Sequence, residues 1–198
     1  MAGRPTLTTL ALCLAVFTVQ TVISAAGIGA GAFALTLPLG HRPWTLATSV
    51  YAHGGVGHLL VNALALLVVG PLVAYVTTPV RFHAFFVCTG AIAGSVQVAV
   101  AAPFGGAAVL GSSGAIFALL GYVLVGNRAS ERALSWLPVG RRGRLLLFVG
   151  IAALVTAVTA APGVALAAHF AGFCLGVGAG RLRLLHVRPR GRRDPPRS

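Results

Sequence analysis

Six long apolar runs divide this chain of 198 residues and constrain its fold more than any other feature. Most are about 20 residues long, the length that spans the hydrocarbon core of a bilayer. Only 9% of the residues are charged, against roughly 25% in soluble domains. We therefore predict an all-α integral membrane protein with six transmembrane helices in one domain, residues 1–182. The runs cover residues 6–26, 55–77, 80–102, 112–127, which is shorter, 144–161 and 164–182.

The segments outside these runs differ in character. The first run ends in Ser24-Ala25-Ala26, which also resembles a signal-peptide cleavage site; its length favours a retained helix, and the sequence leaves open whether all of it is retained. Residues 27–52 are too long for a tight turn and too apolar for a free linker, so they predict a structured loop lying partly in the membrane interface. Residues 183–198 form a basic, proline-rich tail that we expect to be disordered and cytoplasmic.

The placement of the arginines predicts the orientation. All fifteen basic residues are arginine. With six spans and a cytoplasmic N-terminus, fourteen lie on the cytoplasmic side and only Arg42 lies outside, as the positive-inside rule requires. Both termini are therefore expected in the cytoplasm. Basic residues that lie between and after apolar runs argue against nucleic-acid binding. The bias toward Arg, Ala, Gly and Pro indicates a GC-rich bacterial genome, hence a bacterial plasma membrane.

This topology brings a few polar residues to one depth near the outer face. His58 lies about three residues into the second span, Ser113 at the start of the fourth, and His169 about five residues into the sixth. At 1.5 Å per residue, each lies within roughly 8 Å of its helix start. Asn62 follows His58 by one helical turn and shares its face. Each residue alone has an ordinary packing role, but polar groups gathered inside a membrane usually line a functional cavity.

The scarcity of acidic residues limits the chemistry of this cavity. Only Glu131, in a predicted inner loop, and Asp194, in the tail, are acidic. An aspartic dyad and a glutamate-assisted zinc protease therefore lack their carboxylates. Three cysteines far apart in separate apolar runs argue against a disulfide framework or zinc cluster. Acid–base chemistry at the outer side must use histidine, and neither a metal nor a cofactor is predicted.

Three further segments of the chain are Gly111-x-Ser113-Gly114, His53-x4-His58-x3-Asn62 and Ala168-His169-x2-Gly172-x3-Gly176. They resemble the signatures of the rhomboid intramembrane serine proteases. Their order, their spacing and the six-span setting match that family over roughly residues 6–182. The resemblance implies that Ser113 is the nucleophile and His169 its general base, a dyad without a carboxylate.

The same resemblance implies supporting roles around the dyad. His58 and Asn62 would form the oxyanion hole with the Ser113 N–H. Phe117 stands where the family often has a tyrosine that packs on the catalytic histidine, and Trp44 is followed by threonine where the family often has arginine. The small residues of the sixth span predict close packing on the fourth. The remaining support residues are Gly111 and Gly114, which shape the turn, and His53, Gly172 and Gly176, which are structural.

The expected activity is hydrolysis of peptide bonds in or near transmembrane segments of membrane protein substrates in the lipid bilayer. Two alternatives stay open. One is a catalytically inactive rhomboid-like protein that binds membrane clients, against which the intact Ser113 and His169 argue. The other is a small transporter that uses the polar cluster as a solute site; the absence of an intramembrane carboxylate and of internal repeats argues against it.

Overall fold

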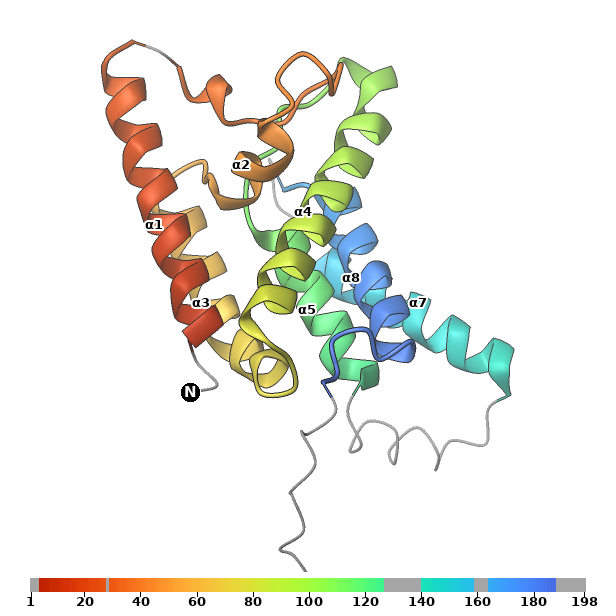
Figure 1. Cartoon of the computed structure of the whole chain (residues 1–198). Coiled ribbons are helices and arrows are strands. Elements are labelled where there is room, and N and C mark those ends of the chain that lie inside the picture. Colours follow the sequence, from red (N-terminus) through yellow and green to blue (C-terminus); the bar gives the residue numbers. More distant parts are fainter. Residues whose placement is uncertain (1–3, 28, 127–139, 159–163, 188–198) are drawn as a thin grey trace, which may run out of the picture.

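The computed structural model describes residues 4–27, 29–126, 140–158 and 164–187, which form a bundle of α-helices (Figure 1). Within this part of the chain there is no strand, apart from one isolated bridge. The predicted all-α membrane fold is confirmed, and each predicted span has a helix whose ends lie within three residues of it. These helices are α1 (Arg4–Ala25), α3 (Val56–Ala74), α4 (Pro79–Ala101), α5 (Ser113–Gly126), α7 (Arg141–Val158) and α8 (Leu166–Arg181).

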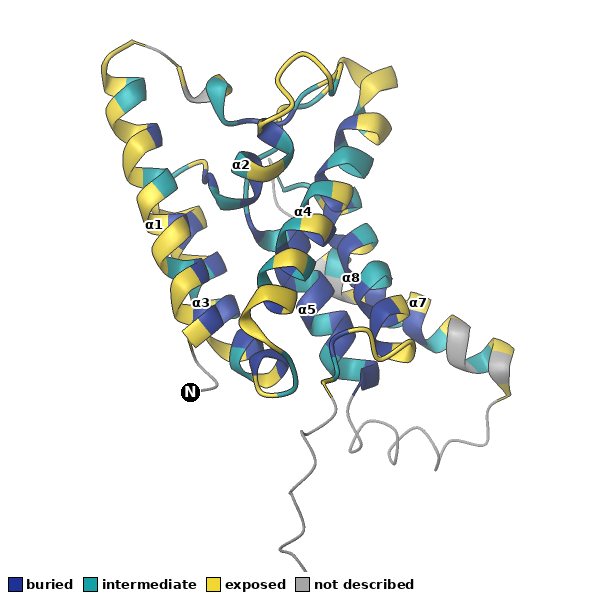
Figure 2. Cartoon of the chain, in the orientation of Figure 1, coloured by how far each residue is buried: buried dark blue, intermediate teal, exposed yellow. Residues whose placement is uncertain are grey.

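The length and composition of the helices fit a membrane setting, although the count of six spans remains a prediction. Among the described helices, α1, α3 and the segment Pro79–Phe104, which joins α4 to a short 3-10 helix, are long and apolar enough to cross a bilayer. Figure 2 shows exposed residues along their outer faces, and many of the exposed residues of these helices are large and apolar. Helix α5 is apolar but has 14 residues, or about 21 Å, against a hydrocarbon core of about 30 Å. Its first turn is buried in the bundle, because Gly114, Ala115 and Ile116 are all buried.

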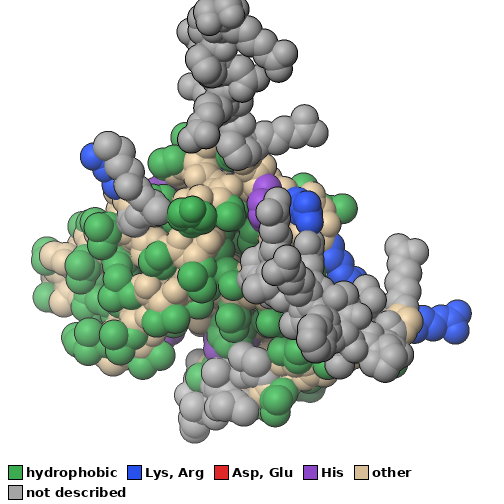
Figure 3. Space-filling model, turned by 90° about the horizontal axis from the view of Figure 1, so that it is seen from below, with side chains coloured by type: hydrophobic (Ala, Val, Ile, Leu, Met, Phe, Trp, Pro, Cys, Tyr) green, Lys and Arg blue, Asp and Glu red, His purple; other side chains and the backbone are tan. Residues whose placement is uncertain are grey.

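Successive long helices run in alternating directions, so that distant segments meet at each end. At the end where α1 begins, the Thr8 hydroxyl lies 2.8 Å from Nε2 of His83 at the start of α4. The N–H of Val187, after α8, donates to the carbonyl of Val76, after α3 (3.1 Å). Viewed from this end, the described side chains are mostly hydrophobic, with arginines among them (Figure 3). The direction of these helices relative to the membrane remains a prediction.

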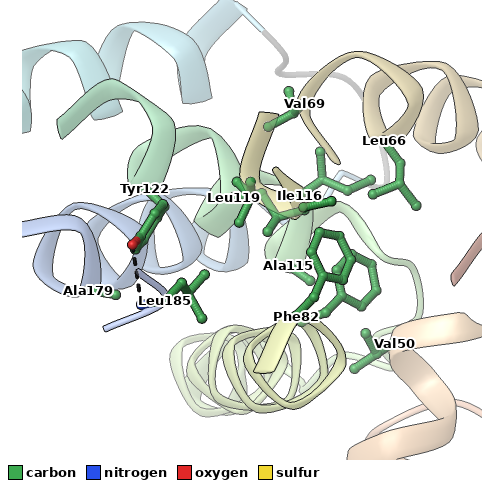
Figure 4. Close-up of a cluster of buried hydrophobic side chains, with 13 residues drawn as sticks. Val50, Leu66, Val69, Phe82, Ala115, Ile116, Leu119, Tyr122, Ala179 and Leu185 are labelled. Atoms are coloured by element: carbon green, nitrogen blue, oxygen red, sulfur yellow. Dashed lines mark hydrogen bonds between the residues drawn. The ribbon is translucent and has the colours of Figure 1, made fainter. Parts of the chain in front are cut away.

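Helix α5 lies at the centre of the bundle, where nine of its residues are buried. The main core cluster combines Leu119 and Tyr122 of α5 with Leu66 of α3 and Phe82 of α4 (Figure 4). Helix α8 approaches α5 so closely that a Cβ at Gly172 would collide with the backbone of Gly114. The predicted close packing of these two small-residue faces is therefore confirmed.

The loop after α1 is structured, as predicted. It contains the 3-10 turn Ala30–Ala32 and helix α2 (Thr45–Tyr51). Arg42 donates from Nη1 to the carbonyl of Gly31 (2.7 Å), and the indole of Trp44 donates to the carbonyl of Ala32 (3.1 Å). An arginine thus anchors the loop although it precedes the tryptophan instead of following it.

The packed chain continues past residue 182, the predicted end of the membrane domain. Leu185 is buried in the main core cluster, and its N–H donates to the Tyr122 hydroxyl (3.2 Å), a contact drawn in Figure 4. That hydroxyl also lies 2.7 Å from Nδ1 of His186. The apolar Leu184 and Leu185 explain this packing, because they interrupt the arginine-rich composition of the tail. Residues 188–198, the rest of the predicted disordered tail, lie outside the described residues.

Candidate active site

The turn before α5 requires glycine at position 111. Its φ of +130° is a conformation that side chains disfavour, and an added Cβ would lie 2.7 Å from the ring of His58. The Gly111 N–H donates to the carbonyl of Ser49 (2.8 Å), and Val109 pairs with Leu35 in the isolated bridge. Contacts with the loop after α1 therefore fix the conformation of this turn. Ser113 follows as the first residue of α5.

Ser112 has a structural hydrogen bond inside the protein. Its side chain is buried, and its hydroxyl lies 3.2 Å from Nε2 of His53. Since Nδ1 of His53 lies 3.0 Å from the carbonyl of Tyr51, Nδ1 carries the hydrogen and Nε2 accepts from Ser112. Burial, and secondarily the neighbouring His58, lower the pKa of His53 to about 4, so its ring is neutral at pH 7. Ser113, which is half-buried, is the more accessible serine.

A residue that the sequence analysis missed holds the backbone of His53. Gln20, buried in α1, donates from Nε2 to the carbonyl of His53 (2.8 Å), and its Oε1 accepts from the His53 N–H (3.1 Å). The two bonds tie α1 to the segment that supports Ser112. A lone glutamine inside an apolar run was the available signal, but it does not indicate the partner.

His58 and Asn62 both belong to α3, and the ring of His58 lies next to Gly111 in the turn. The N–H of Gly54 approaches Nδ1 of His58 at 3.5 Å, which favours the tautomer with hydrogen on Nε2. Asn62 is buried and donates from Nδ2 to the carbonyl of His58 (2.8 Å). It also lines a narrow buried space together with His53 and Ser112. One of its two N–H donors thus serves its own helix, and the structure brings Asn62 beside the serine turn.

His169 belongs to α8, which packs against the start of α5. Its ring is buried and stacks on Phe117, with 4.3 Å between ring centroids and 14° between planes. Phe117 comes four residues after Ser113, so both project from one face of α5. A Cβ at Gly114 would lie 3.6 Å from the carbonyl of Ala168, which places the start of α8 against the start of α5. Ser113 and His169 therefore lie on facing sides of one helix contact.

A second glutamine that the sequence analysis missed lies at the start of α8. Oε1 of Gln97, from α4, accepts from the N–H of Ala167 (2.9 Å) and of Ala168 (3.3 Å). Within the described part of the chain, no group of three or more His, Cys, Asp or Glu side chains is placed to hold a metal ion. The side chains that the described structure places around the start of α5 include the hydroxyls of Ser112 and Ser113, the imidazoles of His53, His58 and His169, and the amide of Asn62.

The described chain is an apolar helical bundle in which Ser113 begins a short buried helix and His169 of α8 packs against that helix. These features are those of a multi-pass membrane protein with a candidate nucleophilic site. The Rhomboid domain model matches residues 40–186. The chain belongs to the rhomboid family, as its three motifs predict.

Three relatives agree with this assignment. RHOMBOID-like protein 5 of Arabidopsis thaliana is 31% identical over 143 residues, covering 72% of this chain and 44% of the relative. RHOMBOID-like protein 1 of the same plant is 33% identical over 138 residues, which cover 69% of this chain and 33% of the relative. Rhomboid protease GluP of Bacillus subtilis (strain 168) is 40% identical over 88 residues, which cover 43% of this chain and 17% of the relative. The chain spans less than half the length of each relative.

Proposed function

We propose that this protein is an intramembrane serine protease in which Ser113 is the nucleophile and His169 the general base. One observation carries the proposal: His169 stacks on Phe117, one helical turn after Ser113 on the same face of α5. Family membership supports the same assignment, because the Rhomboid domain match includes both residues.

The reaction follows from these two groups. Oγ of Ser113 attacks the scissile carbonyl carbon while His169 takes the hydroxyl proton. His169 then gives that proton to the leaving amine, and water, activated in the same way, hydrolyses the acyl-enzyme. No carboxylate lies in the apolar spans, because Glu131 and Asp194 are the only acidic residues. Orientation of the His169 ring therefore relies on Phe117 and on the packing of α8.

Negative charge develops on the carbonyl oxygen during the attack, and in a site with little water fixed hydrogen-bond donors must stabilise it. The Ser113 N–H is one of the first N–H groups of α5, which have no partner within the helix and lie at its positive end. Nε2 of His58 and the second N–H of Asn62 add donors from α3. We assign these three groups to the oxyanion hole.

The substrates in this proposal are transmembrane segments of other membrane proteins. A helical substrate hides its carbonyls in its own hydrogen bonds, so it must unwind at the cut, which small or helix-breaking residues favour. The proposed location is the bacterial plasma membrane, with both termini cytoplasmic, because fourteen of fifteen arginines then face inward. Reporter fusions after Gly40 should read outside and fusions after Pro79 inside; the reverse pattern would refute this orientation.

The test is cleavage of a transmembrane substrate by purified protein in liposomes. Wild-type protein should cut the substrate, while Ser113→Ala and His169→Ala should lose at least about 10³-fold in kcat. Cleavage that persists in both variants would refute the dyad. Folded wild-type protein that binds membrane substrates without cutting any would instead indicate an inactive client-binding protein.

A further inference from the structure

Helix α8, which carries His169, begins without a capping side chain of its own. Its N-cap residue is Ala165, which makes no side-chain hydrogen bond to the helix. The first N–H groups of a helix have no partner within it, and serine, threonine, aspartate or asparagine usually supplies one. The start of α8 therefore depends on another part of the molecule.

Helix α4 supplies the missing acceptor through Gln97. Its Oε1 accepts from the N–H groups of Ala167 and Ala168, at 2.9 and 3.3 Å, in the turn that leads into His169. We propose that Gln97 is a positioning residue that caps α8 from the neighbouring helix and so sets His169 at the height of Ser113. This inference rests on the proposed protease function.

Gln97 differs from the nearby hydroxyl residues of α4. The hydroxyls of Thr89 and Ser95 bond to carbonyls of their own helix, those of Phe85 (2.7 Å) and Ala91 (2.8 Å). Gln97 instead reaches across to α8. Since polar side chains within a membrane are costly unless they find partners, this contact gives Gln97 a specific role in joining the two helices.

The contact between α5 and α8 explains why such a cap is needed. Backbone of α5 meets Gly172 and Gly176 directly, because neither glycine leaves room for a Cβ. A seam of small residues fixes how closely two helices approach, but it offers few interlocking side chains to resist sliding along the helix axis. The hydrogen bonds that Gln97 accepts from the start of α8 fix the position of α8 along its axis. His169 belongs to the same turn, because its own N–H donates to the carbonyl of Ala165 (3.1 Å).

The test compares Gln97→Met, which keeps the length of the side chain but loses the acceptor, with Gln97→Glu, which keeps the acceptor. Ser95→Ala on the same helix is the matched control. Full-length variants in liposomes are assayed with a transmembrane substrate, and kcat is expressed per molecule of folded protein, judged by a cooperative melting transition, so that misfolded protein is not counted. Reactivity with a fluorophosphonate is measured separately, because it also depends on His169. Since a displacement of about 1 Å can cost roughly 10²-fold in rate, Gln97→Met should lower kcat by about 10- to 100-fold with little change in KM.

Gln97→Glu and Ser95→Ala should stay within about threefold of the wild-type kcat, because both keep the cap. If Gln97→Met does not fold, Gln97→Asn, whose shorter amide does not reach the turn, is expected to show the same loss. A wild-type kcat in the folded Met or Asn variant would overturn the inference, as would an equal loss in Gln97→Glu. Wild-type protein that neither labels nor cleaves would contradict the protease function itself, which separates the two failures.

Discussion

The imidazole of His169 lies flat against the phenyl ring of Phe117, with 4.3 Å between centroids and 14° between planes. Stacking of aromatic rings restricts their orientation and contributes about 0.5–1.5 kcal/mol beyond buried area. In the proposed dyad, which has no carboxylate, we expect this aromatic ring to take over part of the orienting role that the third residue of a triad performs.

The first prediction concerns this ring. Phe117→Ala should lower kcat by at least about tenfold, because His169 loses the surface that orients it and the reacting groups depart from their productive geometry. Phe117→Tyr preserves the ring and should stay near the wild-type kcat. The measurement is steady-state cleavage in liposomes, with melting temperatures to confirm folding. Folded Phe117→Ala with a wild-type kcat would remove Phe117 from the orienting role.

The second prediction concerns the seam between α5 and α8. A Cβ at Gly172 collides with the Gly114 backbone, so Gly172→Ala should force the helices apart and cost about 1–3 kcal/mol of stability, as overpacking does. Activity should fall with it, because His169 moves away from Ser113. Gly178→Ala on the same helix is the control, since a Cβ there meets nothing within 4 Å and alanine favours helix by up to about 1 kcal/mol. Thermal melting should rank Gly178→Ala at or above wild type and Gly172→Ala below it; equal melting would contradict the close contact.

The third prediction concerns acid stability. Burial lowers the pKa of His53 from 6.5 to about 4, so between these values the unfolded chain binds a proton that the folded protein does not. The contribution of His53 is therefore fully present above pH 6.5 and is lost as the pH falls toward 4. The melting temperature should decline over this window, and His53→Gln should show a smaller decline. Identical slopes in the two proteins would show that His53 is not the group responsible.

The fourth prediction concerns Asn62. If its second N–H stabilises the oxyanion, Asn62→Ala should lower kcat by roughly 10²-fold and leave KM nearly unchanged, because the contact forms mainly in the transition state. The bond to the carbonyl of His58 adds a small structural contribution, so a modest fall in melting temperature is also expected. Folded Asn62→Ala that cleaves at the wild-type rate would exclude Asn62 from the oxyanion hole.

The long helices were predictable because each corresponds to an apolar run bounded by glycine, proline or arginine, whereas the short helix α2 lies in a segment that was predicted only as a structured loop. The proposed catalytic residues were predictable because three motifs fall near the starts of alternate runs, where the alternating chain direction brings them to one side. Gly111 was implied by its motif, and the structure adds two physical reasons, its positive φ and its contact with His58.

The polar contacts that support the site were not predictable. A glutamine in an apolar run signals a buried partner, but the partner of Gln20 lies 33 positions away and that of Gln97 lies 70 away. Only the packing of the helices determines which backbone groups these side chains reach. Composition also predicted the wrong start for the disordered tail. Arginine dominates the residues from 183 onward, but Leu185 packs into the core.

The most direct test of the central claim is to locate the adduct of a fluorophosphonate on the folded protein by mass spectrometry. The probe reacts with a serine only where a neighbouring base and an oxyanion hole activate it. We expect the adduct on Ser113, its persistence in Ser112→Ala and its disappearance in Ser113→Ala and His169→Ala. An adduct on Ser112, or labelling that survives Ser113→Ala, would contradict the assignment of Ser113 as the nucleophile.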